Sequence, residues 1–338
     1  MNNKTVSIHY INALVKSLER HGHNADEFLK KFDITQQMLT ASTSRVLYEV
    51  FVAFSRYTWK ILKDESFGFS EKPLPNDAFY YGSKLAINSK VLGEALQLLI
   101  GFYNYIEHGY KINLVIYNDD FEIQVVLNKP ELDIHHMLAE FVLCAMHRFS
   151  CWLTGKPIEI KMVEFNFPPP FHQAEYALLF SSSPKRFNSE QLSIRFSAKH
   201  LNLPIIKNNL ELDDYMAVIP MNILLNPVEQ DNYTTKIKRI IESYQGQDFP
   251  NFDWVSQEIH MVPKTLRQKL KSEGVTYQKI KDAMRRDRAI YLMYKPNYTM
   301  ADIAEKLGFT ETCSFVRAFK GWTDFTPGAY RAQFIEEN

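Results

Sequence analysis

The chain has few cysteines and lacks the short motifs that mark common enzyme and metal sites. Its 338 residues include only Cys144, Cys151 and Cys313, with no CxxC pair. Cys144 and Cys151 would lie about 10 Å apart along one expected helix, too far for a disulfide. GxGxxG, GxSxG, HExxH and phosphate-loop motifs are absent as well. We therefore predict a reduced protein with no catalytic residues, no cofactor and no bound metal.

The chain also lacks a long apolar run and a net charge. No stretch approaches the length of a membrane span, and Met1 to Arg20 has no signal-peptide core, so we expect a cytoplasmic protein that does not enter a membrane. Lys plus Arg and Asp plus Glu both number 39, which taken alone argues against nucleic-acid binding. From Tyr233 onward, however, 17 basic residues face 13 acidic ones. A neutral or acidic module joined to a moderately basic one suits a DNA-binding regulator.

The stretch from Asn297 to Arg331 has the pattern of a helix-turn-helix. Thr299 and Asp302 are spaced as a capping pair, and Gly308 suits a left-handed helix end. A second helix is expected from about Glu311, with apolar residues on one face. Its opposite face carries Thr312, Cys313, Arg317 and Lys320. Such a face can donate hydrogen bonds and neutralise phosphate, as a helix in a major groove must, although an ordinary solvated face has the same composition.

The same pattern occurs earlier, between Asn251 and Tyr277. Asn251 can cap a helix from Phe252 to Ile259, and Pro263 fits the first position of the next helix. In that helix two leucine side chains face the core. The residues that face outward are Lys264, Thr265, Arg267, Gln268 and Lys271. A helix from Thr276 to Tyr294 would span roughly 27 Å between the two motifs, about one turn of DNA. One chain could then read two successive major grooves.

These motifs resemble the DNA-binding domain of the AraC/XylS family of transcription regulators. The resemblance covers about 100 residues and rests on Arg267, "RRDRAIYLM", "IAEKLGF" and the run from Phe315 to Arg331. It implies base contacts from Lys264, Arg267 and Gln268 in the first motif, and from Thr312, Cys313 and Arg317 in the second. Two positions depart from the family: Val262 replaces a capping Ser, and His260 replaces a turn Gly. We therefore expect a less well-formed first motif.

The first two-thirds of the chain predicts an α+β domain with helices packed on an antiparallel sheet. Helical patterns cover 6–21, 26–32, 44–62, 90–106 and 131–155, and "YKINLVIYN" and "FEIQVVLN" form a hairpin. Strand-like runs follow at 157–167 and 191–198. The order resembles the so-called arabinose-binding N-terminal domain of one regulator subgroup, which senses a ligand. Gly-bounded short strands of a sugar-binding barrel are absent, so arabinose is not the expected ligand.

An effector pocket is predicted where aromatic residues are dense. The candidate lining residues are Phe79, Tyr80, Tyr81, Phe102, Tyr103, Tyr105, Met137 and Phe141, with Arg45 and Arg56 as cations for an acidic group. The expected ligand is an apolar organic acid such as a fatty acid. Plain core packing accounts for the same aromatic spacing. His136 and His147, eleven residues apart, are too distant along one helix to share a metal ion.

The sequence thus predicts an α+β domain followed by an all-α domain with two helix-turn-helix motifs joined by a long helix. The expected division is 1–207 for effector sensing and dimerisation, 208–232 for a linker and 233–338 for DNA binding. We interpret the chain as a homodimeric transcription regulator that binds double-stranded promoter DNA, a small-molecule effector and, in one possibility, RNA polymerase. Two alternatives stay open. One is a constitutive DNA-binding regulator whose N-terminal domain only dimerises, and the other is an enzyme tethered to DNA.

Overall fold

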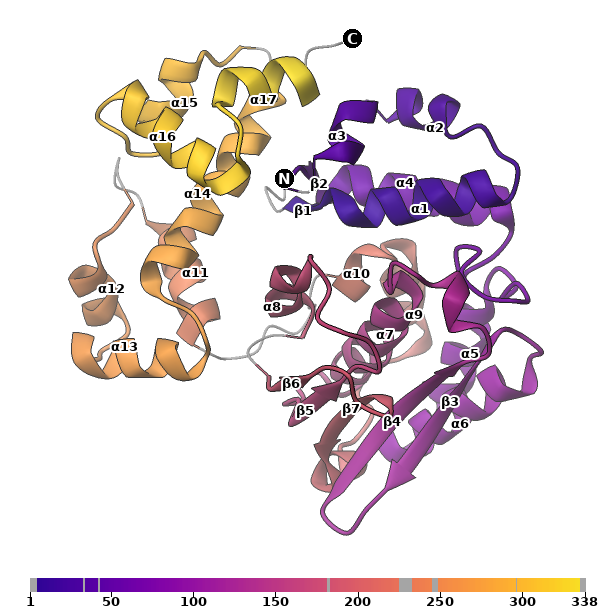
Figure 1. Cartoon of the computed structure of the whole chain (residues 1–338). Helices are drawn as coiled ribbons and strands as arrows, with labels where there is room; N and C mark the ends of the chain where they lie inside the picture. Colours follow the sequence, from indigo (N-terminus) through magenta and orange to yellow (C-terminus); the bar gives the residue numbers. More distant parts are fainter. Residues whose placement is uncertain are drawn as a thin grey trace. The chain divides into compact units, whose positions relative to one another are not determined.

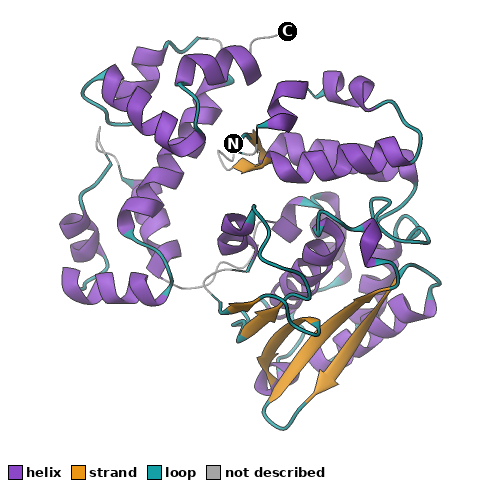
Figure 2. Ribbon diagram, viewed as in Figure 1, coloured by secondary structure: helices purple, strands orange, loops and turns teal. Residues whose placement is uncertain are grey.

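The fold combines a helix-covered β-sheet with a purely helical region that contains two helix-turn-helix motifs (Figures 1 and 2). The structure is a computed structural model and describes residues 5–32, 34–41, 43–180, 183–224, 233–244, 249–295 and 297–334. It confirms the predicted fold class. Within these residues, no helix is both long and apolar enough to cross a bilayer.

The described residues form two compact units. One, the sheet unit, contains residues 12–25 and 52–230, and the other, the helix-turn-helix unit, contains residues 1–11, 26–51 and 231–338. The predicted division at 1–207, 208–232 and 233–338 differs, because it assigns the whole amino-terminal part to a single domain. It stays a prediction about function, since compactness does not test it. Residues 225–232 of the predicted linker lie outside the described residues.

The sheet unit is built on a five-stranded sheet in the order β3-β4-β7-β5-β6. Its strands are β3 (Tyr110–Ile116), β4 (Asp120–Leu127), β5 (Met162–Glu164), β6 (Lys185–Arg186) and β7 (Leu192–Ser197). The pairs along β3-β4-β7-β5 are antiparallel, as predicted, whereas β5 and β6 run parallel. Phe121, Ile123 and Val125 alternate along β4 with at most 3% exposure, so one face of the sheet is core.

Helix α7 (Met137–Thr154) is the central helix of the sheet unit and contacts β4 and β7. Nearly all of its side chains are buried, which explains a sequence that is apolar around most of the helix. Asp133 caps it by accepting the amides of Leu138 and Ala139 at 3.0 and 2.9 Å. The neighbouring helices are α5 (Ala78–Ala86), α6 (Leu92–Tyr105), α8 (Tyr176–Leu179), α9 (Asn209–Ala217) and α10 (Met221–Leu224). Short 3-10 turns occur at Pro130–Leu132, Gln173–Glu175 and Ala198–Asn202.

The described C-terminal residues of the helix-turn-helix unit form seven helices. They are α11 (Tyr233–Ser243), α12 (Phe252–Glu258), α13 (Pro263–Ser272), α14 (Tyr277–Met293), α15 (Met300–Lys306), α16 (Thr312–Thr323) and α17 (Pro327–Phe334). Helices α12 and α13 form the first motif and α15 and α16 the second, and α14 links them (Figure 1). The predicted caps are present: Asn251 caps α12, and Thr299 with Asp302 forms a capping box on α15. Gly308 has φ +70° at the turn.

The amino-terminal residues of this unit form a small two-stranded sheet that the helical pattern did not predict. β1 (Thr5–Ser7) pairs antiparallel with β2 (Arg45–Leu47), and α2 (Ala25–Lys31) and α3 (Gln36–Thr40) precede β2. This small sheet contacts α14 and α17: Tyr330 donates its hydroxyl to the Arg45 carbonyl at 2.9 Å, and Thr5 donates to Asp287 at 2.7 Å. Helices α1 (Ile8–Arg20) and α4 (Tyr48–Leu62) begin next to β1 and β2 and continue into the sheet unit.

Candidate functional site

Helix α13 presents a polar face on the outside of the first motif. Leu266 and Leu270 are at most 1% exposed and pack in one cluster with Ile237 and Val255. This register exposes the five side chains that the sequence assigned to DNA: Lys264, Thr265, Arg267, Gln268 and Lys271. The Arg267 guanidinium lies 5.0 Å from the centre of the Phe252 ring. The guanidinium thus packs on an aromatic ring while its charge stays accessible to solvent.

Helix α16 has the same division into a buried and an exposed face. Phe315 and Phe319 are fully buried, and the Phe319 ring packs edge-on against Tyr330 at 5.3 Å. The four residues assigned to DNA, Thr312, Cys313, Arg317 and Lys320, are all exposed. Glu311 precedes them and accepts the Cys313 thiol at 3.1 Å, which places an acidic group beside the basic face.

Arg285 of α14 ties the two motifs together. Its guanidinium lies 4.8 Å from the Phe249 ring centre, which belongs to the first motif's core, and 4.7 Å from that of Phe309 in the second motif. A guanidinium at these distances is attracted to each ring by a cation–π interaction. Arg285 therefore packs against one aromatic residue from each motif.

The first motif shows the two departures that the sequence indicated. His260 has φ +56°, a conformation that glycine adopts without strain. Val262 stands at the N-cap of α13 with φ −67° and ψ 135°, and no side chain caps the helix. The motif nevertheless forms in full, because its apolar cluster and the Asn251 cap on α12 are in place.

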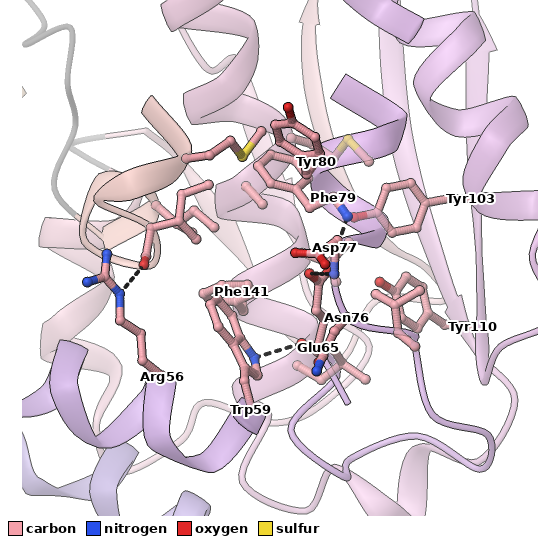
Figure 3. A pocket seen from close by; sticks show the side chains of 18 of the residues that line it. Arg56, Trp59, Glu65, Asn76, Asp77, Phe79, Tyr80, Tyr103, Tyr110 and Phe141 are labelled. Carbon is pink, nitrogen blue, oxygen red and sulfur yellow. Dashed lines mark hydrogen bonds between the residues drawn. The ribbon is translucent and has the colours of Figure 1, made fainter. Parts of the chain in front are cut away.

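The sheet unit contains a cavity of about 430 Å³ between α4, α5, α6, β3, α7, α9 and α10. Its apolar lining includes Trp59, Phe79, Phe141, Leu138, Met146, Met216, Ile219 and Ile223. Its polar lining includes Arg56, Lys60, Glu65, Asn76, Asp77, Tyr80, Tyr103 and Tyr110 (Figure 3). A mostly apolar cavity of this size with a few polar groups is typical of small-molecule sites.

Glu65 and Asp77 are acidic residues that line the cavity, and Glu65 is the less exposed of the two. The structure places Glu65 beside the start of α5. Its carboxylate accepts the Asp77 amide at 2.7 Å and the Phe79 amide at 3.0 Å, and so caps α5. Burial of the carboxyl group, which outweighs these two hydrogen bonds, raises the pKa of Glu65 to about 7. Trp59 donates its indole N–H to the Glu65 carbonyl at 3.1 Å and stacks on Phe67, so the aromatic wall is anchored to the same loop.

Five of the ten residues assigned to an effector line this cavity: Arg56, Phe79, Tyr80, Tyr103 and Phe141. The other five do not. Tyr81 and Tyr105 are 59% and 90% exposed, and Phe102 and Met137 lie outside the lining. Arg45 belongs to the helix-turn-helix unit, where it donates to Thr5. The sequence missed Trp59, Glu65 and Tyr110, although the aromatic residues near Phe79 indicated this region.

The histidines and cysteines of α7 have structural partners. His147 bonds the Ile158 carbonyl at 2.8 Å, and burial lowers its pKa to about 3. Burial raises the pKa of Cys144 to about 12. In the described part of the chain, no three His, Cys, Asp or Glu side chains are grouped so that they could hold a metal ion.

Family models match both halves of this architecture. The model described as the arabinose-binding domain of AraC transcription regulators matches residues 22–205, more than half of the chain, and a helix-turn-helix domain model matches residues 255–333. The chain belongs to the AraC family of transcription regulators.

Other AraC-family proteins support this assignment. The ornithine utilization regulator of Pseudomonas aeruginosa is 28% identical to this chain over 72% of each sequence. The transcriptional regulator VqsM of the same species is 27% identical, over 64% of this chain and 67% of its own. The solved structure of the regulator CdpR, also from P. aeruginosa, is 20% identical over 96% of this chain and 98% of its own. Its TM-score of 0.31 is too low to carry a structural argument.

Proposed function

We propose that this AraC-family regulator reads promoter DNA through α13 and α16, and that a small molecule in the cavity of the sheet unit controls this reading. The observation that carries the proposal is the composition of the cavity wall. Met216, Ala217, Ile219 and Ile223 belong to the segment that leads from the sheet unit toward α11. A ligand in the cavity would therefore contact the segment that leads from the proposed effector site to the proposed DNA-binding helices.

The DNA-reading part of the proposal rests on the exposed faces of α13 and α16. Arg267 and Arg317 both project from a helix whose other face is buried, and an Arg side chain can bridge the O6 and N7 atoms of guanine. Lys264, Lys271 and Lys320 add charge for phosphate contacts. The basic surplus of this region is small, so specific contacts rather than general attraction would supply most of the affinity.

The control part rests on contacts between Arg56 and this wall. Arg56 of α4 donates through Nε to the Ile219 carbonyl at 2.7 Å and through Nη2 to the Ala217 carbonyl. A ligand that fits only one arrangement of these residues would shift the population of that arrangement, and a coupling of about 1–3 kcal/mol is typical. Homodimerisation, contact with RNA polymerase and an organic-acid effector stay predictions from the sequence.

The test begins with selection of a binding sequence from random duplexes by the full chain. Affinity for that duplex is then measured by fluorescence anisotropy with and without candidate effectors, at constant salt. Fatty acids, aromatic acids and amino acids form the candidate set, and ornithine is included because one relative is named for its utilization. We expect at least one compound to raise the melting temperature and to change DNA affinity about five-fold or more.

Ile223→Trp provides the matched variant, because an indole at this position would fill the cavity from the connecting segment. Leu210→Trp is the control, since Leu210 is 80% exposed on α9 and does not line the cavity. The response should disappear only in Ile223→Trp. If no compound that binds the protein changes its affinity for DNA, effector control is rejected. The alternative of a constitutive DNA-binding regulator then takes its place.

A further inference from the structure

We name the end of the cavity beside Tyr103 and Tyr110 its inner end. Among the described lining residues, this end has hydrogen-bond acceptors but no basic side chain. Glu65, Tyr103 and Tyr110 come from the loop after α4, from α6 and from β3, and they lie on one side of the cavity (Figure 3). The charged groups that act most on Glu65 are Asp77 and Asp64, and both are acidic. Asp64 is itself occupied, since it accepts the amides of Ser66, Gly68 and Leu74.

The hydroxyl groups of two tyrosines at this end form no hydrogen bond with the described residues. Tyr103 and Tyr110 are only 5% and 4% exposed, and both side chains line the cavity. Neither hydroxyl has a hydrogen-bond partner among the residues that the structure describes. Neither hydroxyl is among the fully buried side-chain atoms that lack a partner, so both reach the open space of the cavity. Each of them is therefore accessible to a hydrogen bond from a molecule in the cavity.

The basic residues that line the cavity, Arg56 and Lys60, do not lie at its inner end. Arg56 lies on the side away from Tyr103 and Tyr110, and its guanidinium donates to the Ala217 and Ile219 carbonyls (Figure 3). Lys60, the other basic lining residue, is solvent-exposed. A carboxylate at the inner end would face Glu65 with no cation beside it. An ammonium group would find a carboxylate, two hydroxyl acceptors and the aromatic faces of Trp59 and Phe141.

We infer that the effector carries a cationic amino group, which binds at the inner end of the cavity among Glu65, Tyr103 and Tyr110. This inference rests on the proposed effector function and reverses the organic-acid expectation from the sequence. The rest of such a molecule is apolar and lies against Phe79, Phe141 and Met146. The ammonium donates to the Glu65 carboxylate and to the phenol oxygens, and these charge-assisted bonds select amines over neutral or anionic molecules of the same shape.

The test uses three probes that share one skeleton: 3-phenylpropylamine, 3-phenylpropanol and 3-phenylpropanoate. Their dissociation constants for the full chain are measured by calorimetry at pH 8 and pH 5.5. At pH 8 we expect the amine to bind at least about tenfold more tightly than either other probe, the factor that a hydrogen bond to a charged group contributes. At pH 5.5 the amine should lose most of this advantage, because Glu65 gains a proton on passing below a pKa of about 7 while an alkylammonium stays charged.

Three variants locate the interaction. Glu65→Gln should lower amine affinity about tenfold and remove its pH dependence, whereas Glu19→Gln, an exposed change on α1, should leave both unchanged. Tyr103→Phe and Tyr110→Phe should each weaken the amine about three-fold or more without reducing the melting temperature, because neither hydroxyl bonds to a described residue. The tyrosine variants keep the test valid if loss of the α5 cap impairs folding of Glu65→Gln.

The outcomes separate this inference from the proposed function. Equal or tighter binding of the carboxylate, or amine binding that all three variants leave unchanged, would overturn the amine site while effector control stands. If none of the probes binds, even at millimolar concentration, both the amine site and the effector cavity are rejected.

Discussion

Arg317 is the residue at which base reading by α16 can be tested most directly. It is exposed, and its Nη2 lies 3.5 Å from the Ser314 hydroxyl, so it makes no strong bond that would keep it from DNA. Arg317→Ala should cost about 1–3 kcal/mol of specific binding, because the bidentate contact to guanine is lost. Titration of the selected duplex measures the loss. Arg288→Ala, an exposed change on α14, is the control for simple charge removal, and an equal loss there would contradict a specific role for Arg317.

Phe319 tests the buried face of the same helix. Its ring has no exposure and packs against Phe315, Trp322 and Tyr330 at 5.7, 6.2 and 5.3 Å between centres. Phe319→Ala should lower the free energy of unfolding of the helix-turn-helix unit by about 3–5 kcal/mol, because the cavity left behind cannot fully collapse. Chemical denaturation measures this value. Phe171→Ala, at a position that is 69% exposed, should change stability by less than about 0.5 kcal/mol.

Helical geometry explains which predicted pocket residues were misplaced. Tyr103 and Tyr105 are two positions apart on α6, so they lie about 200° apart around the axis, and only one can face the cavity. Tyr103 does, while Tyr105 is 90% exposed. Glu65 could not be found from sequence, because it lies in a loop without periodicity and joins the cavity through long-range packing. The outward residues of α13 and α16 were predictable, since two buried positions per helix determine which face is exposed.

At the scale of elements, α13 offers a direct gain in stability. Its N-cap, Val262, is 67% exposed, has extended dihedral angles and supplies no capping bond. Val262→Ser should raise the free energy of unfolding by about 0.5–2 kcal/mol, because a serine hydroxyl accepts an otherwise unpaired amide of the first turn. Thermal denaturation of this unit checks the gain. Val262→Ala removes the same apolar surface without adding a cap, and a matching increase there would show that capping is not the cause.

Most elements could be predicted because their signals are local. Capping residues predicted the starts of α12 and α15, and alternation predicted β3, β4 and β7. The small sheet of β1 and β2 could not be predicted, since each strand has three residues and its partner is about 40 positions away in the chain. The helices predicted at 6–21 and 44–62 therefore included, at their starts, residues that form β1 and β2.

At the scale of the whole molecule, the pH dependence of stability combines opposing groups. Burial raises the pKa values of Glu65 and Asp133 to about 7, and it lowers those of His135 and His136 to about 4. The two acids contribute stability that is full below about pH 4 and is lost as the pH rises through 7. The histidines contribute stability above pH 6.5 that is lost as the pH falls toward 4. The contributions offset each other, so the parent curve alone does not isolate either.

Glu65→Gln isolates the Glu65 contribution. Relative to the parent, this variant should gain about 1–3 kcal/mol of stability between pH 5 and pH 8, because only the parent must bury a charge at high pH. The predicted quantity is the change with pH, since loss of the α5 cap shifts the whole difference by a constant amount. Urea denaturation of both proteins at several pH values measures it. A difference that stays flat would mean that Glu65 has an ordinary pKa.

The small sheet of β1 and β2 joins parts of the helix-turn-helix unit that are synthesised far apart in time. Thr5 and Asp287 are separated by 282 positions, and Arg45 and Tyr330 by 285. A ribosome synthesises residues 12–25 and 52–224 of the sheet unit after Thr5 and before Asp287, so this unit can emerge and pack in the interval. Helices α14 and α17 gain their contacts with the small sheet only after that interval. The sheet unit therefore has time to fold before the two distant parts of the helix-turn-helix unit meet.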